Sequence, residues 1–381
     1  MKVTFPYMGT TVVYKKLLEM LGHDVIMAPK PTRKTINIGV KYSPEFACFP
    51  LKVIMGSYFE AIQKGAEVIV TSGGNGPCRA GFYEKVHQKI LESEGYDVDF
   101  IVFDSMFRDP GTFYENMIRL KGKTPWHKVL KAMVFIYDMI GKLDHLEKMV
   151  QGIRAHEKNP GETTRLWEKI QHDFDQAFTF QALKEAFANG KEKLKMIPTK
   201  EIGESERIRI GIVGEIYVVM EDSINMKMEQ LLNSLGAEVE RSQYLSQWVT
   251  YNMLPKWMNW THEKAVLKKG EPYIPILIGG HAKQSVGQIV DYGQRKFDGV
   301  VHLMPFGCLP ELVSQSIIPK ISEDYNIPVL TISLDEQTGI ANNQTRVEAF
   351  VDLVRGKRRQ QIKKQKKELQ GNEPKHCCSS N

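Results

Sequence analysis

Apolar and polar positions follow two patterns along this chain, one of alternating strands and helices and one of helices alone. The pattern changes twice. In the first hundred residues, short apolar runs predict strands at 2–6, 24–28, 34–41, 66–72 and 98–103. Between these runs, apolar residues at helical spacing predict helices at 12–21, 52–64 and 82–94. Parallel strands need such crossover helices, so this alternation predicts a doubly wound parallel sheet.

The strand pattern disappears in the middle of the chain. Long amphipathic stretches at 125–154 and 161–189 predict helices, with Gly190 placed to end the second one. We therefore expect a helical segment that caps or bridges two sheets.

The strand–helix alternation returns after residue 205. Strands are predicted at 208–213, 238–241, 274–279, 299–304 and 329–334, and helices at 223–235, 285–295, 311–325 and 345–354. The fold class expected for the whole chain is α/β, with two doubly wound, Rossmann-like parallel-sheet domains and an intervening helical segment. The expected boundaries are 1–105, 106–204 and 205–356, followed by a basic, disordered tail at 357–381.

The charge of the chain lies in that tail. Residues 357–381 carry eight Lys or Arg and two Glu, which accounts for the entire net charge of +6. Such a tail either contacts nucleic acid or an acidic partner, or is a solvated extension of the last helix. The neutral body gives no reason to expect nucleic-acid binding. We find no secretory signal and no apolar run of membrane-spanning length, so we expect a cytoplasmic protein without membrane contact.

Three of the five cysteines share one setting. Cys48, Cys78 and Cys308 each lie in a loop containing proline, glycine or both, which we expect to follow the carboxyl end of a strand. In an open α/β sheet, ligands bind at that edge. A large chain with so few cysteines is not a disulfide framework. The other two, Cys377 and Cys378, are expected to be mobile thiols of the tail.

Three converging thiolates indicate a soft-metal site. An iron–sulfur cluster is the first interpretation, because no histidine follows at zinc-finger spacing and no CxxC pair is present. A cubane cluster normally takes four thiolates, so three would leave one iron with an open position. A three-thiolate zinc site and three inert buried thiols remain as alternatives.

Candidate catalytic residues are weaker, and the catalytic group is unassigned. Glu45 is either an acid/base group or a helix-capping carboxylate. His281 follows a predicted strand and either reaches the cleft or is a satisfied loop histidine. Glu311 is expected in a first helical turn, where the helix dipole favours a carboxylate. Because neither a GxGxxG nor a Walker A motif is present, we do not expect ATP to bind this chain.

Several segments resemble one known family. They are PEFACFPLK at 44–52, GPCR at 76–79, GEIYV at 214–218, PFGCLPE at 305–311, DEQTG at 335–339 and TRVEAF at 345–350. In these segments the chain resembles the 2-hydroxyacyl-CoA dehydratase family, which is related to benzoyl-CoA reductase. It is most similar to the activase-associated branch often labelled "CoA protein activase".

The resemblance implies a [4Fe-4S] cluster held by Cys48, Cys78 and Cys308. It also implies an ATP-dependent iron–sulfur activator as electron donor, an acyl-CoA substrate that loses its 2-hydroxyl group through a ketyl radical, and a homo- or heterodimer. The chain would then be a lyase or a redox component of anaerobic metabolism that passes electrons onward. The alternative is a non-catalytic zinc- or ligand-binding module that uses the same interdomain cleft.

Overall fold

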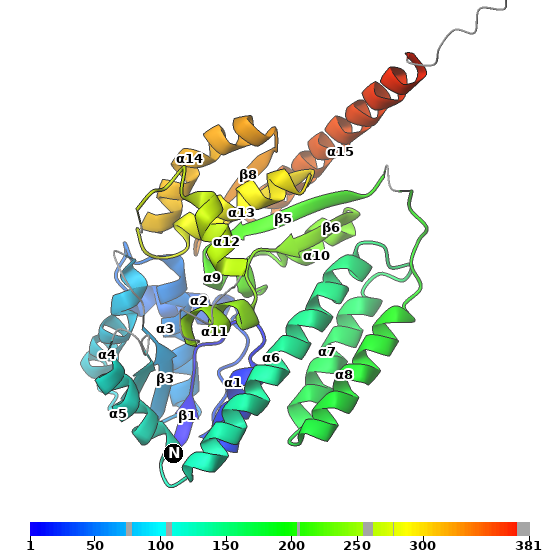
Figure 1. Cartoon of the computed structure of the whole chain (residues 1–381). Coiled ribbons are helices and arrows are strands. Elements are labelled where there is room, and N and C mark those ends of the chain that lie inside the picture. Colours follow the sequence, from blue (N-terminus) through cyan, green and yellow to red (C-terminus); the bar gives the residue numbers. More distant parts are fainter. Residues whose placement is uncertain (74–77, 104–108, 204–205, 254–261, 277, 372–381) are drawn as a thin grey trace, which may run out of the picture.

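A computed structural model describes residues 1–73, 78–103, 109–203, 206–253, 262–276 and 278–371. Within these residues, the side chains of 252–253 and 365–371 are not described. Figure 1 shows two sheets stacked one above the other, with a group of long helices to one side.

The first sheet has four parallel strands in the order β2-β1-β3-β4. Its strands are β1 (Lys2–Thr4), β2 (Asp24–Val25), β3 (Val68–Ser72) and β4 (Asp99–Phe103). Its helices are α1 (Val12–Met20), α2 (Arg33–Tyr42), α3 (Phe49–Gln63), the 3₁₀ helix η1 (Arg79–Phe82) and α4 (Tyr83–Ser93). The order reverses direction between β1 and β3, which makes the ends of these strands a ligand-binding position.

The second sheet repeats this arrangement as β6-β5-β7-β8, again all parallel. Its strands are β5 (Ile208–Gly214), β6 (Ala237–Arg241), β7 (Gly299–Pro305) and β8 (Val329–Leu334). Its helices are α9 (Ile216–Met220), α10 (Met228–Ser234), α11 (Leu245–Met253), α12 (His262–Gly270), α13 (Ala282–Gln294), α14 (Leu309–Tyr325) and α15 (Ile340–Gly371). The predicted α/β fold with two doubly wound parallel sheets is therefore confirmed.

Two predicted strands are wrong. Residues 34–41 lie in α2, where Thr32 and Thr35 form a reciprocal capping box that starts a helix. Residues 274–279 form no strand in their described part, and residue 277 lies outside it. That segment connects α12 to α13, which pack against each other, and Pro275 has no N–H to give to a sheet.

The helical segment contains α5 (Pro110–Lys121), α6 (Trp126–Arg154), α7 (Glu162–Gln176) and α8 (Phe180–Lys195). Thr179 caps a new helix by accepting a bond from the backbone N–H of Ala182, so the stretch predicted as one helix is two. Gly190 lies inside α8 and does not end it. A Cβ atom at Gly190 would lie 3.2 Å from the side chain of Ile170, so the glycine lets α8 pack closely against α7.

The last helix is much longer than the predicted 345–354. It continues to Gly371, so residues 357–371, which composition assigned to a disordered tail, are helical. In Figure 1 this helix projects away from the body of the molecule. Cys377 and Cys378 lie outside the described residues. Among the helices that the structure describes, none combines the length and apolar character needed to cross a membrane.

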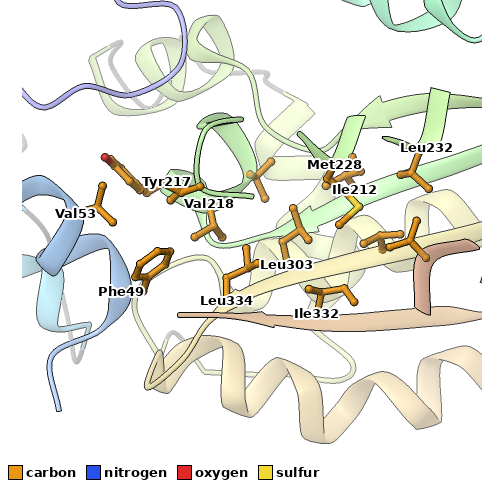
Figure 2. Close-up of a cluster of buried hydrophobic side chains, with 14 of the residues drawn as sticks. Phe49, Val53, Ile212, Tyr217, Val218, Met228, Leu232, Leu303, Ile332 and Leu334 are labelled. Atoms are coloured by element: carbon orange, nitrogen blue, oxygen red, sulfur yellow. The ribbon is translucent and has the colours of Figure 1, made fainter. Parts of the chain in front are cut away.

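Helix α3 joins the two sheets. Its residues Phe49 and Val53 belong to the same buried cluster as Val218, Leu303 and Leu334 of the second domain, and Figure 2 shows Phe49 and Val53 facing the strand ends of the second sheet. Polar bonds reinforce this contact. The buried Lys52 donates to Glu336 over 2.6 Å, and the hydroxyl of Tyr217 donates to the backbone oxygen of Tyr7. The first turn of α3 is thus held against the second domain.

Candidate metal centre

Each of the three cysteines that we predicted as ligands immediately precedes a helix. Cys48 is the N-cap of α3, Cys78 of η1 and Cys308 of α14, and all three have extended backbone angles. Proline occupies one of the first two positions of α3 and α14, which suits its fixed φ and missing N–H. The helix that was expected to follow each cysteine is confirmed, so each sulfur lies near the positive end of a helix.

Two of the cysteines occupy equivalent places in the two sheets. Cys78 follows β3 and Cys308 follows β7, and each of these strands borders the point where its sheet changes direction. Cys48 is different, because it lies between α2 and α3. The prediction that all three cysteines follow strands is therefore wrong for Cys48. Its position near the other two comes from the packing of α3 against the second domain.

The side chain of Arg79 ties the three cysteine loops together. Arg79 follows Cys78 directly, and its Nη1 donates to the backbone oxygen of Phe46, two residues before Cys48, over 2.7 Å. Its Nη2 donates to the backbone oxygen of Gly307, the residue before Cys308. One guanidinium thus connects loops that lie 33 and 228 residues away from it in sequence.

Other contacts confirm that the three loops meet. The Sγ atom of Cys48 is hydrogen-bonded to the hydroxyl of Tyr83, at the start of α4 just beyond Cys78. A Cβ atom at Gly280 would lie 2.7 Å from Pro310, two residues past Cys308, and 3.5 Å from the sulfur of Cys78. Cys48 and Cys308 are buried, whereas Cys78 is partly exposed. The three cysteine loops therefore lie together, with Cys48 and Cys308 shielded from solvent and Cys78 partly accessible to it.

The charges around the site disfavour three free thiolates. Burial raises the pKa of Cys48, Cys78 and Cys308, and the carboxylate of Glu215 raises all three further. A thiolate at Cys48 would also raise the pKa values of Cys78 and Cys308, because like charges repel. Without a positive group between them, the three thiols stay protonated at neutral pH.

Glu215 follows β5 and occupies the centre of this electrostatic pattern. Its carboxylate caps α9 by accepting the backbone N–H of Val218 over 3.1 Å. Burial raises the pKa of Glu215 to about 7, although backbone N–H groups of Tyr217 and Val218 act in the opposite direction. In the sequence this position stands out only as part of the segment GEIYV, just after the predicted strand at 208–213.

The three weaker candidates have different surroundings. Glu311 is completely buried in α14, where it contacts Nε2 of His302 at 2.8 Å and accepts a hydrogen bond from Ser285 over 3.1 Å. It therefore braces α14 against β7 and α13. Glu45 is exposed in the turn before Cys48. His281 is the N-cap of α13 and follows Gly280 in the sequence, and burial lowers its pKa.

Arg79 and Tyr83 were missed as functional residues by reasoning from the sequence. Arg79 was noted only as part of the segment GPCR, and no local pattern predicts which backbone oxygens its guanidinium reaches. The contact of Arg79 with Gly307 depends on how the two domains dock, whereas its contact with Phe46 lies within the first domain. The only available signal was its position directly after a candidate ligand.

Among the described residues, no three His, Cys, Asp or Glu side chains are close enough to bind one metal ion together. In an iron–sulfur cluster each cysteine binds a different iron, so the sulfurs stand further apart than the ligands of a single ion.

Comparison with known proteins agrees with this part of the structure. Residues 283–354 match the model of the family described as "2-hydroxyglutaryl-CoA dehydratase, D-component". The resemblance to the 2-hydroxyacyl-CoA dehydratase family is confirmed. The matched segment runs from α13 to the first half of α15 and includes Cys308, while Cys48 and Cys78 lie outside it. No curated protein matches the chain.

Proposed function

We propose that this dehydratase-like chain holds a [4Fe-4S] cluster on Cys48, Cys78 and Cys308. The observation that carries the proposal is the convergence of three thiols from three loops and two domains, held together by Arg79. The three thiols are buried or half-buried, have raised pKa values and lie near the carboxylate of Glu215. A positively charged group bound between them would stabilise this donor set.

The loops around the sulfurs are suited to a cluster. Three helices begin at the cysteines, so their first backbone N–H groups have no partner within the helix and are available to sulfur. Hydrogen bonds to sulfur and limited solvent exposure set the potential of such clusters. The zinc alternative would place the same three thiolates on a single ion, and analysis of the bound metal distinguishes the two.

With three protein thiolates, one iron of a bound cubane would keep a position open to an exchangeable ligand. Such a cluster supplies one-electron transfer and, at the open position, a Lewis acid. The chain contributes the three thiolates and excludes water on the Cys48 and Cys308 sides. Glu215 adds a carboxylate whose pKa near neutrality allows it to hold or release a proton beside the sulfurs.

The surface around the site is suited to a protein partner. Phe46, Phe82 and Phe306 flank the three cysteine loops and are 82%, 66% and 61% exposed. Exposed aromatic side chains are typical anchors of protein interfaces. We assign this rim to an ATP-dependent iron–sulfur activator that delivers electrons to the cluster. The reduced site then acts on an acyl-CoA or passes the electron onward.

The test uses the chain reconstituted anaerobically with iron and sulfide. After addition of an activator of this family with MgATP and a reductant, absorbance near 400 nm should bleach only when ATP is present. The Phe306→Ser variant should retain its cluster and bleach more slowly, because the partner loses an anchor. A cluster that no activator reduces would contradict the electron-accepting role, and a chain that binds zinc and no iron would contradict the cluster.

A further inference from the structure

The sulfur of Cys48 has a side-chain hydrogen-bond partner. The hydroxyl of Tyr83, the first residue of α4, is hydrogen-bonded to the Sγ atom of Cys48. The sulfurs of Cys78 and Cys308 are approached by backbone N–H groups instead, those of Ala80 and Glu311. A backbone group remains when a side chain is replaced, whereas the Tyr83 hydroxyl can be removed by a single substitution. This contact can therefore be tested by itself.

The direction of this hydrogen bond is fixed once Cys48 loses its proton. A thiol and a phenol can each donate, but a thiolate or metal-bound sulfur can only accept, so Tyr83 then donates. Burial holds the pKa of Tyr83 well above its ordinary value, and a negative charge on Cys48 raises the pKa of Tyr83 further. The hydroxyl therefore keeps its proton at neutral pH and remains a donor.

The buried side chain of His87 holds Tyr83 in place. It lies one turn further along α4, and its ring centroid is 5.8 Å from that of Tyr83 and 5.2 Å from that of Tyr58 in α3. Nε2 of His87 donates to the backbone oxygen of Leu51, three residues after Cys48, over 3.1 Å. Helix α4 is thus bonded to the first turn of α3 at two points, which keeps the Tyr83 hydroxyl beside the sulfur.

A hydrogen-bond donor at a ligand sulfur acts differently on the two redox states of a bound cluster. Reduction by one electron makes the ligand sulfurs more negative, and a hydrogen bond to a more negative acceptor is stronger. The donor therefore stabilises the reduced state more than the oxidised state, which raises the reduction potential. Arg79 and Glu215 act on Cys48 by charge, in opposite directions, so the hydroxyl is the neutral contribution at this sulfur.

We infer that Tyr83 raises the reduction potential of the proposed cluster by donating a hydrogen bond to the sulfur of Cys48. The inference rests on the proposed function and adds a residue to it that acts through a ligand. The electron comes from the activator. The proton stays on the hydroxyl oxygen of Tyr83, so no covalent bond forms or breaks.

A redox titration of the anaerobically reconstituted full chain tests the inference. Tyr83→Phe removes the hydroxyl and keeps the ring, so the packing against His87 is preserved. Its reduction potential should lie about 30–60 mV below that of the wild type, which is a threefold to tenfold change in a one-electron equilibrium constant. Electron–nuclear double resonance on the reduced wild type should also detect an exchangeable proton that Tyr83→Phe lacks. A role limited to packing would change neither result.

Tyr292→Phe is the matched control. Tyr292 is completely buried, and its hydroxyl donates over 3.0 Å to the backbone oxygen of Glu240 in β6, not to a cysteine loop. The control should keep the wild-type potential. Tyr83→Phe with full iron content and an unchanged potential overturns the inference and leaves the proposed function intact. So does a Tyr83→Phe chain that cannot hold the cluster, because Tyr83 would then serve assembly. A wild-type chain that takes up no iron overturns both.

Discussion

Arg79→Lys tests whether one guanidinium holds the three cysteine loops together. The arginine donates from two nitrogens to two carbonyl oxygens on different domains. A lysine keeps the positive charge, but its single ammonium cannot reach both oxygens in the same fork geometry. The substitution therefore removes one bond across the domain interface and leaves the local charge unchanged.

The size of the effect follows from the bond that is lost. A hydrogen bond from a charged donor contributes about 1.5–3 kcal/mol, and the exposure of Arg79 reduces this to about 1–1.5 kcal/mol. Since 1.4 kcal/mol is a factor of ten, the variant should lose its cluster roughly five to ten times faster than the wild type. The assay is the anaerobic rate at which a chelator removes iron from the reconstituted protein. Without a cluster, amide hydrogen exchange at 306–308 should also become faster.

Arg119→Lys is the control for this experiment. Arg119 also donates to a backbone oxygen and to a carboxylate, but its partners are Phe100 and Asp99 in the first sheet, not the cysteine loops. The Arg119→Lys variant should lose its cluster at the wild-type rate. If Arg79→Lys and the wild type lose iron equally fast, Arg79 does not hold the loops and the proposed role is wrong.

Three further predictions concern packing and protonation. Gly56→Ala should destabilise the fold by about 3 kcal/mol in chemical denaturation, because a Cβ there would overlap the carbonyl of Thr35; Gly141→Ala, with open space around it, should stabilise by up to about 1 kcal/mol. Burial lowers the pKa of His87 to about 4, so the unfolded chain binds the extra proton between pH 6.5 and 4. The unfolding free energy should therefore fall by about 1.4 kcal/mol for each unit by which the pH is lowered across that window. His87→Gln should make the unfolding free energy depend less steeply on pH. Because burial raises the pKa of Cys48, iodoacetamide should alkylate it slowly at pH 7 in the metal-free chain and faster as the pH rises above 9, and mass spectrometry that finds rapid labelling at pH 7 would contradict this.

The sequence predicts the sheets well because their signal is local. Buried parallel strands such as β5 and β7 are continuous apolar runs between turns, and the helices that connect them have clear apolar faces. The error at 34–41 has an equally local cause. Ile36, Ile38 and Val40 alternate with polar residues as in a strand, yet Thr32 caps a helix and Gly39 packs against the backbone of α3. Capping and close packing outweighed the alternation.

The sequence singles out the three cysteines of the proposed metal centre but not the contacts that hold their loops together. Proline and glycine around Cys78 and Cys308 mark loops at strand ends, and this pattern is visible in the sequence alone. The location of Cys48 depends on the docking of α3 against the second domain, which no local pattern encodes. The bond from Arg79 to Gly307 and the charge effect of Glu215 depend on the same docking, so only the structure shows them.

The central claim is best tested by measuring iron and acid-labile sulfide in chains purified without oxygen. The account predicts about four irons and four sulfides per wild-type chain. It also predicts loss of both from Cys48→Ser, Cys78→Ser and Cys308→Ser, and no change in a Cys377→Ser/Cys378→Ser variant. A wild-type chain with one zinc and no sulfide, or a full cluster in any of the three single variants, would contradict it.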